Sequence, residues 1–459
     1  MQPKLPIAGA VLLCLGLVAC GGNEHDAAAM QDNAFASTYK PLPSKSTLIS
    51  NATILMGNGE KLDKGSLLIK DGKIAALGKR IGATRATVKI DAEGKWVTPG
   101  LIDVHSHQGV YPAPDVAAHE DGNEMTDPNT AQVWAEHSVW PQDPGFITAL
   151  AGGVTTLQIL PGSANLFGGR SVTLKNVPAR TVQAMKFPGA PYGLKMACGE
   201  NPKWVYGRES NKAPMTRMGN VAGYRSAWIA AADYMKKMKN HADDNGADAP
   251  IRDLQLETLA GVLKGEILVH NHCYRADEMA TMIDIAKEFG YKITAFHHAV
   301  EAYKVADLLA ENNICAAMWA DWWGFKMEAF DGIRENIPFV DKAGACAIVH
   351  SDSEVGVQRL NQEAAKAMAA AQRAGIEVTP EQAMRWLTLN PAIALGVDTE
   401  TGSLEKDKMA DIVIWDGNPF SVYSKAEKVF VDGALVYDRD DPTLQPKTDF
   451  SVGILGGTQ

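Results

Sequence analysis

Between residues 96 and 399, short apolar runs alternate with amphipathic segments, and this alternation limits the possible folds more than any other feature. It is typical of α/β proteins in which helical crossovers join parallel strands. We expect helices at Ala276–Phe289, Glu301–Glu311 and Gln358–Ala374. The expected strands are Val97–His105, Val154–Leu160, Gly193–Ala197, Ile267–His270, Ile293–His297, Ile314–Met318 and Cys346–His350, with Ser171–Asn176 as the candidate eighth. Eight such units predict a closed (β/α)8 (TIM) barrel. An open doubly wound sheet is the rival fold, but no glycine-rich phosphate loop marks its usual site.

Both flanks of this region have a different pattern, with β-rich runs separated by turn dipeptides such as Asp71-Gly72 and Asp432-Gly433. Residues 47–95 form the first flank and residues 400–445 the second. Neither flank has enough strands for a stable sheet alone. We therefore expect one small composite β-sandwich built from the N- and C-terminal segments, beside a barrel of residues 96–399.

The N-terminus has the pattern of a processing signal. The apolar run Ile7–Val18 is too short to span a bilayer as a helix. Leu17-Val18-Ala19-Cys20 resembles a bacterial lipobox, which predicts a signal peptide over residues 1–20 and lipidation of Cys20. An ordinary secretory signal cut near Ala19 is the alternative. Residues 21–46 are expected to be a flexible tether. The sequence thus predicts a lipid-anchored protein of the bacterial cell envelope, facing the periplasm or the exterior, with no other membrane contact.

The 459-residue chain is 46% hydrophobic and carries a net charge of −10. A net acidic chain is poorly suited to phosphates, so nucleic acid is excluded as a partner, while assembly into a homo-oligomer stays open. Besides Cys14 and Cys20, each cysteine lies in or beside an apolar run, and the spacings indicate no disulfide framework. We expect four buried small hydrophobic residues, with one bridge, Cys315 to Cys346, left open: Cys198, Cys273, Cys315 and Cys346.

Polar residues stand at the ends of the expected barrel strands, where they converge on one face. His105 and His107 are two residues apart, so both point the same way from one strand. The candidate metal ligands are His105, His107, Lys195, His270, His298 and Asp352. Four imidazoles and a carboxylate suit one or two divalent ions, with zinc expected, and leave a position for water. A carboxylated Lys195 would bridge two ions, and Glu200 is its rival as a ligand.

Other residues near these strand ends have expected roles in catalysis and binding. Asp352 is expected to take the proton of the attacking water and return it to the leaving nitrogen. His272 is expected to polarise the scissile carbonyl, His297 to alternate away from His298, and His350 to support the ligands from behind. Four residues are expected to line the mouth of the barrel, Arg170 either binding a substrate carboxylate or forming a structural ion pair: Gln108, Tyr111, Arg170 and Trp322.

Several motifs together identify a family resemblance. They are Pro99–His107, Gly153–Thr156, Pro161–Asn165, His298–Tyr303, His350–Asp352, Gly402–Leu404 and Ala410–Trp415. In this combination the chain resembles the amidohydrolase superfamily, in its imidazolonepropionase-like or prolidase-like branch. The resemblance implies a (β/α)8 barrel with a composite β-sandwich, and metal ligation by four histidines and Asp352. Imidazolonepropionases use one metal and have no bridging lysine, whereas prolidase-like members carry an Ile-Lys motif that Leu194-Lys195 partly matches.

The expected function is metal-dependent hydrolysis of C–N bonds, in which the ion lowers the pKa of the attacking water. Dipeptides, N-acyl amino acids and cyclic amides are the expected small-molecule substrates. The first alternative is a mononuclear deaminase or an imidazolonepropionase-like cyclic amide hydrolase. The second is a non-catalytic surface lipoprotein that uses the barrel as a scaffold.

Overall fold

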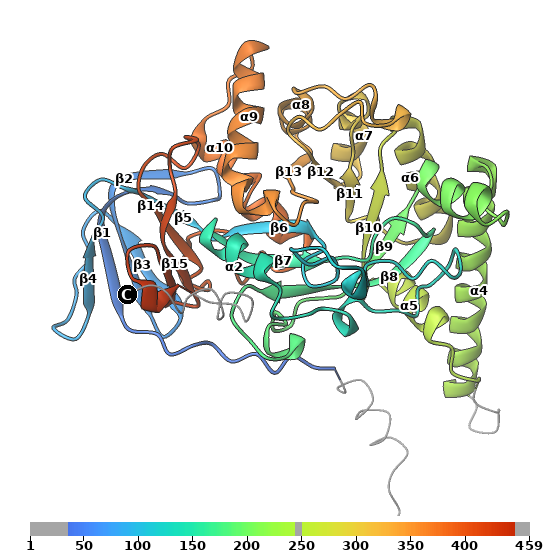
Figure 1. Ribbon diagram of the computed structural model, residues 1–459, viewed down its shortest axis with the longest axis horizontal. Helices are drawn as coiled ribbons and strands as arrows, with labels where there is room; N and C mark the ends of the chain where they lie inside the picture. Colours follow the sequence, from blue (N-terminus) through green and yellow to red (C-terminus); the bar gives the residue numbers. More distant parts are fainter. Residues whose placement is uncertain (1–34, 244–249, 446–459) are drawn as a thin grey trace, which may run out of the picture. The chain divides into compact units, whose positions relative to one another are not determined.

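The computed structural model describes residues 35–243 and 250–445 (Figure 1). Cys20, the predicted signal peptide and residues 21–34 of the predicted tether lie outside the described residues. Within the described ranges, no helix combines the length and the apolar character needed to cross a membrane.

Eight strands form the barrel sheet, and they follow one another around it in chain order. They are β6 (Leu101–Ser106), β7 (Val154–Ile159), β8 (Phe167–Lys175), β9 (Gly193–Ala197), β10 (Leu268–Cys273), β11 (Ala295–His298), β12 (Cys315–Met318) and β13 (Cys346–Val349). All eight predicted strands are present, and the predicted barrel fold is confirmed. Its regularity differs from the prediction in two places.

The first difference is the direction of β8, which pairs antiparallel with both β7 and β9. Residues 160–166 connect β7 to β8 and contain no helix. A parallel pair needs a crossover of a dozen or more residues, so this short connection can only reverse the chain. Side chains on β8 consequently run in the opposite order from those on the other barrel strands.

The second difference is the seam between β6 and β13, which stand at the two ends of the sheet order. Main-chain atoms of Trp386 and Leu387 bridge it. The Ile102 N–H donates to the Leu387 carbonyl at 2.9 Å, and the Val349 N–H donates to the Trp386 carbonyl at 3.1 Å. Nearer the strand ends, the Asp352 N–H donates to the His105 carbonyl at 3.1 Å. The barrel is therefore nearly closed, and the ends of β6 and β13 are held together.

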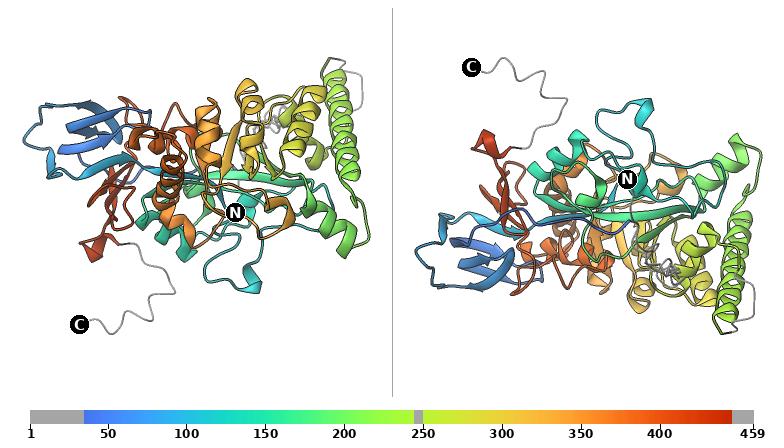
Figure 2. Two further views of the ribbon diagram at one scale, coloured as in Figure 1. Left: turned by 90° about the horizontal axis from the view of Figure 1, so that it is seen from above. Right: turned by 90° about the horizontal axis from the view of Figure 1, so that it is seen from below.

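Helices cover the outside of the barrel (Figures 1 and 2). They are α2 (Pro144–Ala151), α4 (Arg217–Asp243), α5 (Leu254–Leu263), α6 (Ala276–Phe289), α7 (Ala306–Glu311), α8 (Asn336–Lys342), α9 (Leu360–Arg373), α10 (Pro380–Arg385) and α11 (Leu389–Ala394), with a short turn α3 (Glu200–Pro202). Helix α6 has the predicted bounds. The main hydrophobic core lies between these helices and the outward faces of the strands.

A second sheet contains strands from both ends of the chain, as predicted. The strands are β1 (Thr47–Leu55), β2 (Lys61–Lys70), β3 (Lys73–Gly78), β4 (Val88–Asp91), β5 (Trp96–Pro99), β14 (Ile412–Trp415), β15 (Ala426–Val431) and β16 (Ala434–Asp438). Strand β5 joins the two halves, because it pairs with β1 on one side and β14 on the other. The hydrogen bonds form one continuous composite sheet around its own core. In Figure 2 its blue and red strands lie side by side.

The predicted strand Val97–His105 is wrong as a single element, because the chain divides at Gly100 into β5 and β6. The Gly100 N–H donates to the Asp411 carbonyl at 2.9 Å. A Cβ atom at Gly100 would lie 2.0 Å from Thr155 Oγ1, so no other residue fits this close approach. Gly100 thus separates the strand of the composite sheet from the strand that carries the histidines.

A buried ionic network joins the barrel to the composite sheet. Lys175, at the end of β8, is fully buried, and its Nζ donates to Asp411 at 3.1 and 3.2 Å and to Asp432 at 2.7 Å. The Tyr39 hydroxyl donates to the other oxygen of Asp432. Tyr39 belongs to the segment predicted as tether, so this part of the segment is in contact with the folded domain.

Two disulfides link neighbouring barrel strands, one between Cys198 and Cys273 and one between Cys315 and Cys346. The expectation of four unpaired cysteines is wrong. The bridge between Cys315 and Cys346, which the sequence leaves open, is present because these residues are partners in register on β12 and β13. The sequence does not indicate the bridge between Cys198 and Cys273, because only the order of the strands in the barrel makes β9 and β10 neighbours.

Candidate metal centre and active site

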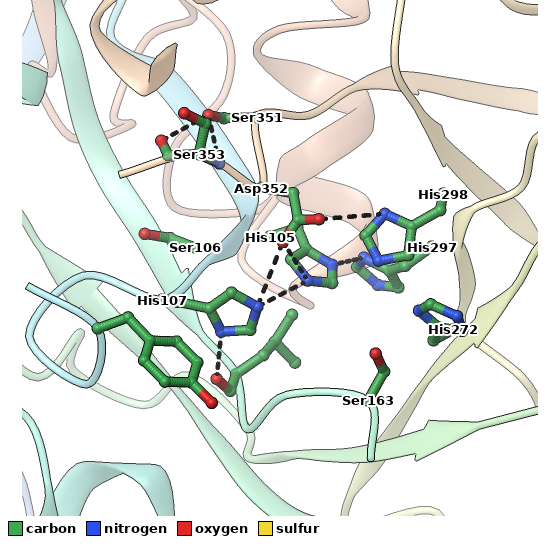
Figure 3. Close-up of polar contacts among 12 residues, drawn as sticks. His105, Ser106, His107, Ser163, His272, His297, His298, Ser351, Asp352 and Ser353 are labelled. Carbon is green, nitrogen blue, oxygen red and sulfur yellow. Dashed lines mark hydrogen bonds and ion pairs between the residues drawn. The ribbon is translucent and has the colours of Figure 1, made fainter. Parts of the chain in front are cut away.

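The polar residues predicted at the strand ends gather inside the barrel (Figure 3). His105 and His107 come from β6 and from the residue that follows it, and Asp352 follows β13 across the seam. His105 Nε2 lies 3.3 Å from His107 Nε2. Asp352 Oδ1 lies 3.4 Å from His105 Nε2 and 3.3 Å from His107 Nε2. Three potential ligand atoms therefore meet at one point.

The protonation of His107 can be assigned from its other ring nitrogen. Nδ1 lies 2.8 Å from the Leu160 carbonyl, which only accepts hydrogen bonds, so Nδ1 carries the proton. In the neutral ring, Nε2 then presents a lone pair to the Asp352 carboxylate. Two acceptors at this distance repel each other unless a cation lies between them. These three ligand atoms thus fit a divalent metal. The hydrogen bond to the Leu160 carbonyl fixes the orientation of the His107 ring, as hydrogen bonds to metal-binding histidines commonly do.

Two residues of this centre have left-handed backbone, His298 with φ 69° and Asp352 with φ 55°. This conformation costs a residue other than glycine about 1–3 kcal/mol and clusters at functional sites. At His298 it interrupts the alternation of side chains along β11. As a result His297 and His298 both face the barrel interior, whereas the sequence predicted that they point apart.

His297 lies between two other histidines. Its Nδ1 is 2.8 Å from His105 Nδ1, and its Nε2 is 2.9 Å from His270 Nδ1. Burial is the main reason that the pKa of His105 and of His297 lies well below the usual value and that the pKa of His270 falls to about 3. The three rings are therefore neutral, which is the form that binds metals.

His270 lies deeper in the barrel than predicted, because β10 continues three residues past its predicted end to Cys273. His270 pairs in register with Lys195, and its buried Nε2 has no partner among the described residues. Lys195 is fully buried, and its Nζ donates to the Pro161 carbonyl at 3.0 Å. Burial lowers the pKa of Lys195 to about 7, against the opposing charge of Asp352. These two predicted ligands form a deeper layer below His105 and Asp352.

His298 and His350 extend the upper layer. His298 Nδ1 lies 3.7 Å from Asp352 Oδ2 and 3.0 Å from His350 Nε2. Nitrogens of His105, His298 and His350 all lie within 4.8 Å of one another, as do ligand atoms of His105, His107 and Asp352. Sequence reasoning gave His350 only a supporting role. Its spacing of two from Asp352 was the signal that both side chains could face the site.

The predicted mouth residues divide into two groups. Tyr111 packs edge-on against His107, with ring centroids 5.6 Å apart, and its hydroxyl accepts a hydrogen bond from Asn123 at 2.5 Å. Trp322 stacks on Trp319, which in turn stacks on His298 at 4.3 Å. Tyr111 therefore contacts a metal-centre histidine directly, and Trp322 lies one ring further out, behind Trp319. Gln108 is buried beneath the mouth, where its side chain donates to the Glu354 carbonyl at 3.4 Å.

Arg170 does not line the mouth. Its partner in register on β9 is Leu194, which faces the outer core. Arg170 Nε donates to Thr258 Oγ1 of α5 at 2.8 Å, and its guanidinium stacks over Trp134. The prediction placed Arg170 in the loop before the strand Ser171–Asn176, but β8 begins at Phe167, so Arg170 is a strand residue whose side chain points outward.

His272 lies above His270 on the same strand face and is buried. Its Nε2 is 3.4 Å from the amide nitrogen of Asn201, and its Nδ1 has no partner among the described residues. Asn201 Oδ1 accepts from Lys326, so Asn201 Nδ2 faces the imidazole as a donor. His272 Nε2 is thus the acceptor, and Nδ1 carries the proton. Glu200, the rival ligand, instead pairs with Lys326 at 3.5 Å.

A nearly closed barrel with histidines and an aspartate at its strand ends defines a class of metal-dependent hydrolases. The chain belongs to the amidohydrolase family, whose model matches residues 96–438. It is 31% identical over 439 residues to amidohydrolase tasK of Hapsidospora irregularis, covering 90% of this chain and 43% of tasK, less than half of that protein. It is 24% identical to an imidazolonepropionase of Pseudomonas aeruginosa, covering 80% of this chain and 91% of the relative. A crystal structure of an amidohydrolase from Thermotoga maritima superposes with a TM-score of 0.79 at 36% identity, covering 86% of this chain and all of that one. The chain accordingly has the barrel fold of this family.

Proposed function

We propose that this protein hydrolyses the C–N bonds of small amides such as dipeptides, N-acyl amino acids or cyclic amides. The observation that carries the proposal is the meeting of His105 Nε2, His107 Nε2 and Asp352 Oδ1 within 3.4 Å of one another. This arrangement suits a bound cation, and the chain belongs to the amidohydrolase family.

Each residue then has a chemical task. A divalent ion held by His105, His107 and Asp352 would lower the pKa of a water and polarise the substrate carbonyl. Asp352, whose carboxylate is partly exposed, accepts the proton of the attacking water and passes it to the leaving nitrogen. The free Nδ1–H of His272 donates to the carbonyl oxygen as negative charge develops on it.

Zinc is the proposed ion, because imidazole and carboxylate ligands with an open position are typical of catalytic zinc. A second ion would need Lys195. Burial favours the neutral amine, the form that reacts with carbon dioxide to give a bridging carbamate. Lys195 would then supply the anionic ligand shared by two ions.

The alternative is a one-metal deaminase or cyclic amide hydrolase. Two groups of possible ligands favour it, because they have His105 in common and so cannot each hold an ion independently. One group is His105, His298 and His350, and the other is His105, His107 and Asp352. The similarity to an imidazolonepropionase supports the same alternative. A non-catalytic scaffold would have no use for a complete set of ligands at the strand ends.

Metal analysis together with an activity screen separates these functions. Purified protein is loaded with zinc, its metal content is measured, and it is assayed with dipeptides, N-acyl amino acids and cyclic amides. About two ions per chain and cleavage of acyclic amides would support the proposal. One ion with activity on cyclic amides or amino-heterocycles alone would favour the alternative. Metal-loaded protein inactive on all of them would refute both.

We also propose that the protein is lipid-anchored in the cell envelope. The lipobox-like sequence ending at Cys20 supports this, and so do the two disulfides, which persist in oxidising compartments. The full chain expressed in bacteria should enter the detergent phase of a Triton X-114 partition, whereas the Cys20→Ser variant should stay in the aqueous phase. Equal partitioning of the two proteins would contradict the proposal.

A further inference from the structure

A lysine of the loop between β12 and α8 reaches into the mouth of the barrel. Lys326 Nζ donates to Asn201 Oδ1 at 2.7 Å and lies 4.3 Å from the centre of the Tyr274 ring. Its side chain is only 22% exposed. A lysine at a loop tip ordinarily keeps its ammonium in water, since burying the charge is costly. The position of Lys326 therefore calls for a functional reason.

Lys326 is connected to the catalytic residues by its two neighbours. Asn201 also donates to Ser163 Oγ at 2.8 Å and faces His272 Nε2 at 3.4 Å. Tyr274 stacks on His298 and packs edge-on against His272. The ammonium thus stands at the rim of the site, one side chain away from the residues that handle the scissile bond.

Lys326 has fewer direct ion pairs than two other cations of the barrel domain, Arg217 and Lys366. Arg217 pairs with both Glu278 and Glu328, and Lys366 pairs with both Asp321 and Glu363. Among the described residues Lys326 forms one ion pair, with Glu200, at 3.5 Å, while the charges of Glu328 and Asp352 act on it without direct contact. An ammonium has three donors, so Lys326 can bind an incoming anion without giving up Asn201.

The opposite side of the mouth has the opposite charge. A cavity of about 310 Å³ adjoins His107 and Asp352, and its lining includes Asp115, Glu120 and Glu354. These carboxylates disfavour a substrate carboxylate on that side. A substrate that spans the centre and carries a carboxylate would place it at Lys326.

We propose that Lys326, held in place by Asn201, binds a carboxylate of the substrate and makes amides with a free carboxylate the preferred class. Dipeptides and N-acyl amino acids are then cleaved in preference to uncharged amides of the same shape. This inference rests on the proposed hydrolase function and specifies its substrates.

The test compares acids with matched amides. Zinc-loaded full-length protein is given a library of dipeptides and the same library with C-terminal carboxamides, and cleavage of the peptide bond is followed. We expect kcat/KM to be about 10- to 100-fold higher for the acids, the usual effect of a charge-assisted hydrogen bond. Lys326→Met should reduce the acid-to-amide ratio by that factor, mainly through KM, and Lys326→Arg should retain most of it.

Lys366→Met is the matched control, because it removes a lysine that is already paired and should leave the ratio as in the wild type. Equal metal content and thermal midpoints show that the variants are folded. Wild-type protein that cleaves acids and amides equally, or a Lys326→Met variant that keeps the preference, overturns the inference and leaves the proposed function standing. Failure to cleave either library overturns the inference, and the proposed function falls with it only if N-acyl amino acids and cyclic amides are not cleaved either.

Discussion

The buried ammonium of Lys175 should contribute more to stability than any exposed ion pair of the molecule. Lys175→Met keeps a side chain of similar length but leaves Asp411 and Asp432 facing each other without a cation. Both carboxylates are buried. Removing one partner of a buried ion pair typically costs about 3–5 kcal/mol, and we expect that loss in the free energy of unfolding at neutral pH.

Urea unfolding, followed by tryptophan fluorescence, measures this loss. Burial and the charge of Asp411 already raise the pKa of Asp432, and loss of the ammonium raises it further. A carboxyl group whose pKa is raised in the folded state destabilises that state as the pH rises and the group loses its proton. The difference in free energy of unfolding between the wild type and Lys175→Met should therefore be smaller at pH about 5 than at pH about 8.

Two controls make the measurement specific to the network. Lys237→Met removes an exposed lysine paired with Asp233 and should change the free energy of unfolding by less than about 0.5 kcal/mol. Lys175→Met combined with Asp411→Asn and Asp432→Asn removes all three charges and should recover at least half of the loss. A Lys175→Met variant within about 1 kcal/mol of the wild type at neutral pH would refute the reasoning.

Three further predictions concern the site and its supports. Asp352→Asn should lower kcat by about 10²- to 10⁴-fold with an unchanged thermal midpoint, and a normal rate would remove Asp352 from proton transfer. Burial and Asp432 raise the pKa of the Tyr39 hydroxyl in the folded protein. The protonated hydroxyl therefore stabilises the folded state fully below pH about 10, the pKa of tyrosine in the unfolded chain, and this stabilisation is lost as the pH rises above that value. The thermal midpoint of Tyr39→Phe should therefore lie below that of the wild type at pH about 8, and the gap should narrow at pH about 10.5; a constant gap would contradict this. Gly100→Ala should destabilise the protein by about 1–3 kcal/mol or more in urea unfolding, because its Cβ meets Thr155, and the cost should be smaller in a Thr155→Ala background. Equal costs in the two backgrounds would locate the strain elsewhere.

The hydrophobic pattern was sufficient to predict the eight barrel strands and the union of the two chain ends, because burial imposes a period on each element. The positions of His105 and His107 followed from alternation along a regular strand, and that of Asp352 from its place shortly after a strand end. The direction of β8 was not predicted, although the few residues between β7 and β8 indicate it in retrospect. Arg170 was wrongly expected at the mouth for another reason, because β8 begins four residues before its predicted start, at Phe167 instead of Ser171, and takes this residue into the strand.

The inner histidines could not be placed correctly for a different reason. His298 and Asp352 adopt left-handed backbone that residues other than glycine rarely take, and nothing in their sequence marks it. The three residues of β10 beyond its predicted end moved His270 one layer down. Tertiary contacts determine both features, and those contacts involve residues far apart in the chain.

The composite sheet has a consequence for how the newly made chain matures. Strands β1 to β5 are synthesised first, yet β5 has no neighbour on one side until β14 leaves the ribosome. Until then the apolar faces of Ile54 and Val97 stay without the Ile412 and Ile414 side chains that share their core. One edge of β5 must therefore stay unpaired and open to aggregation for nearly the whole of translation. A chain held unfolded by a chaperone until synthesis ends, as in post-translational export, would avoid that exposure.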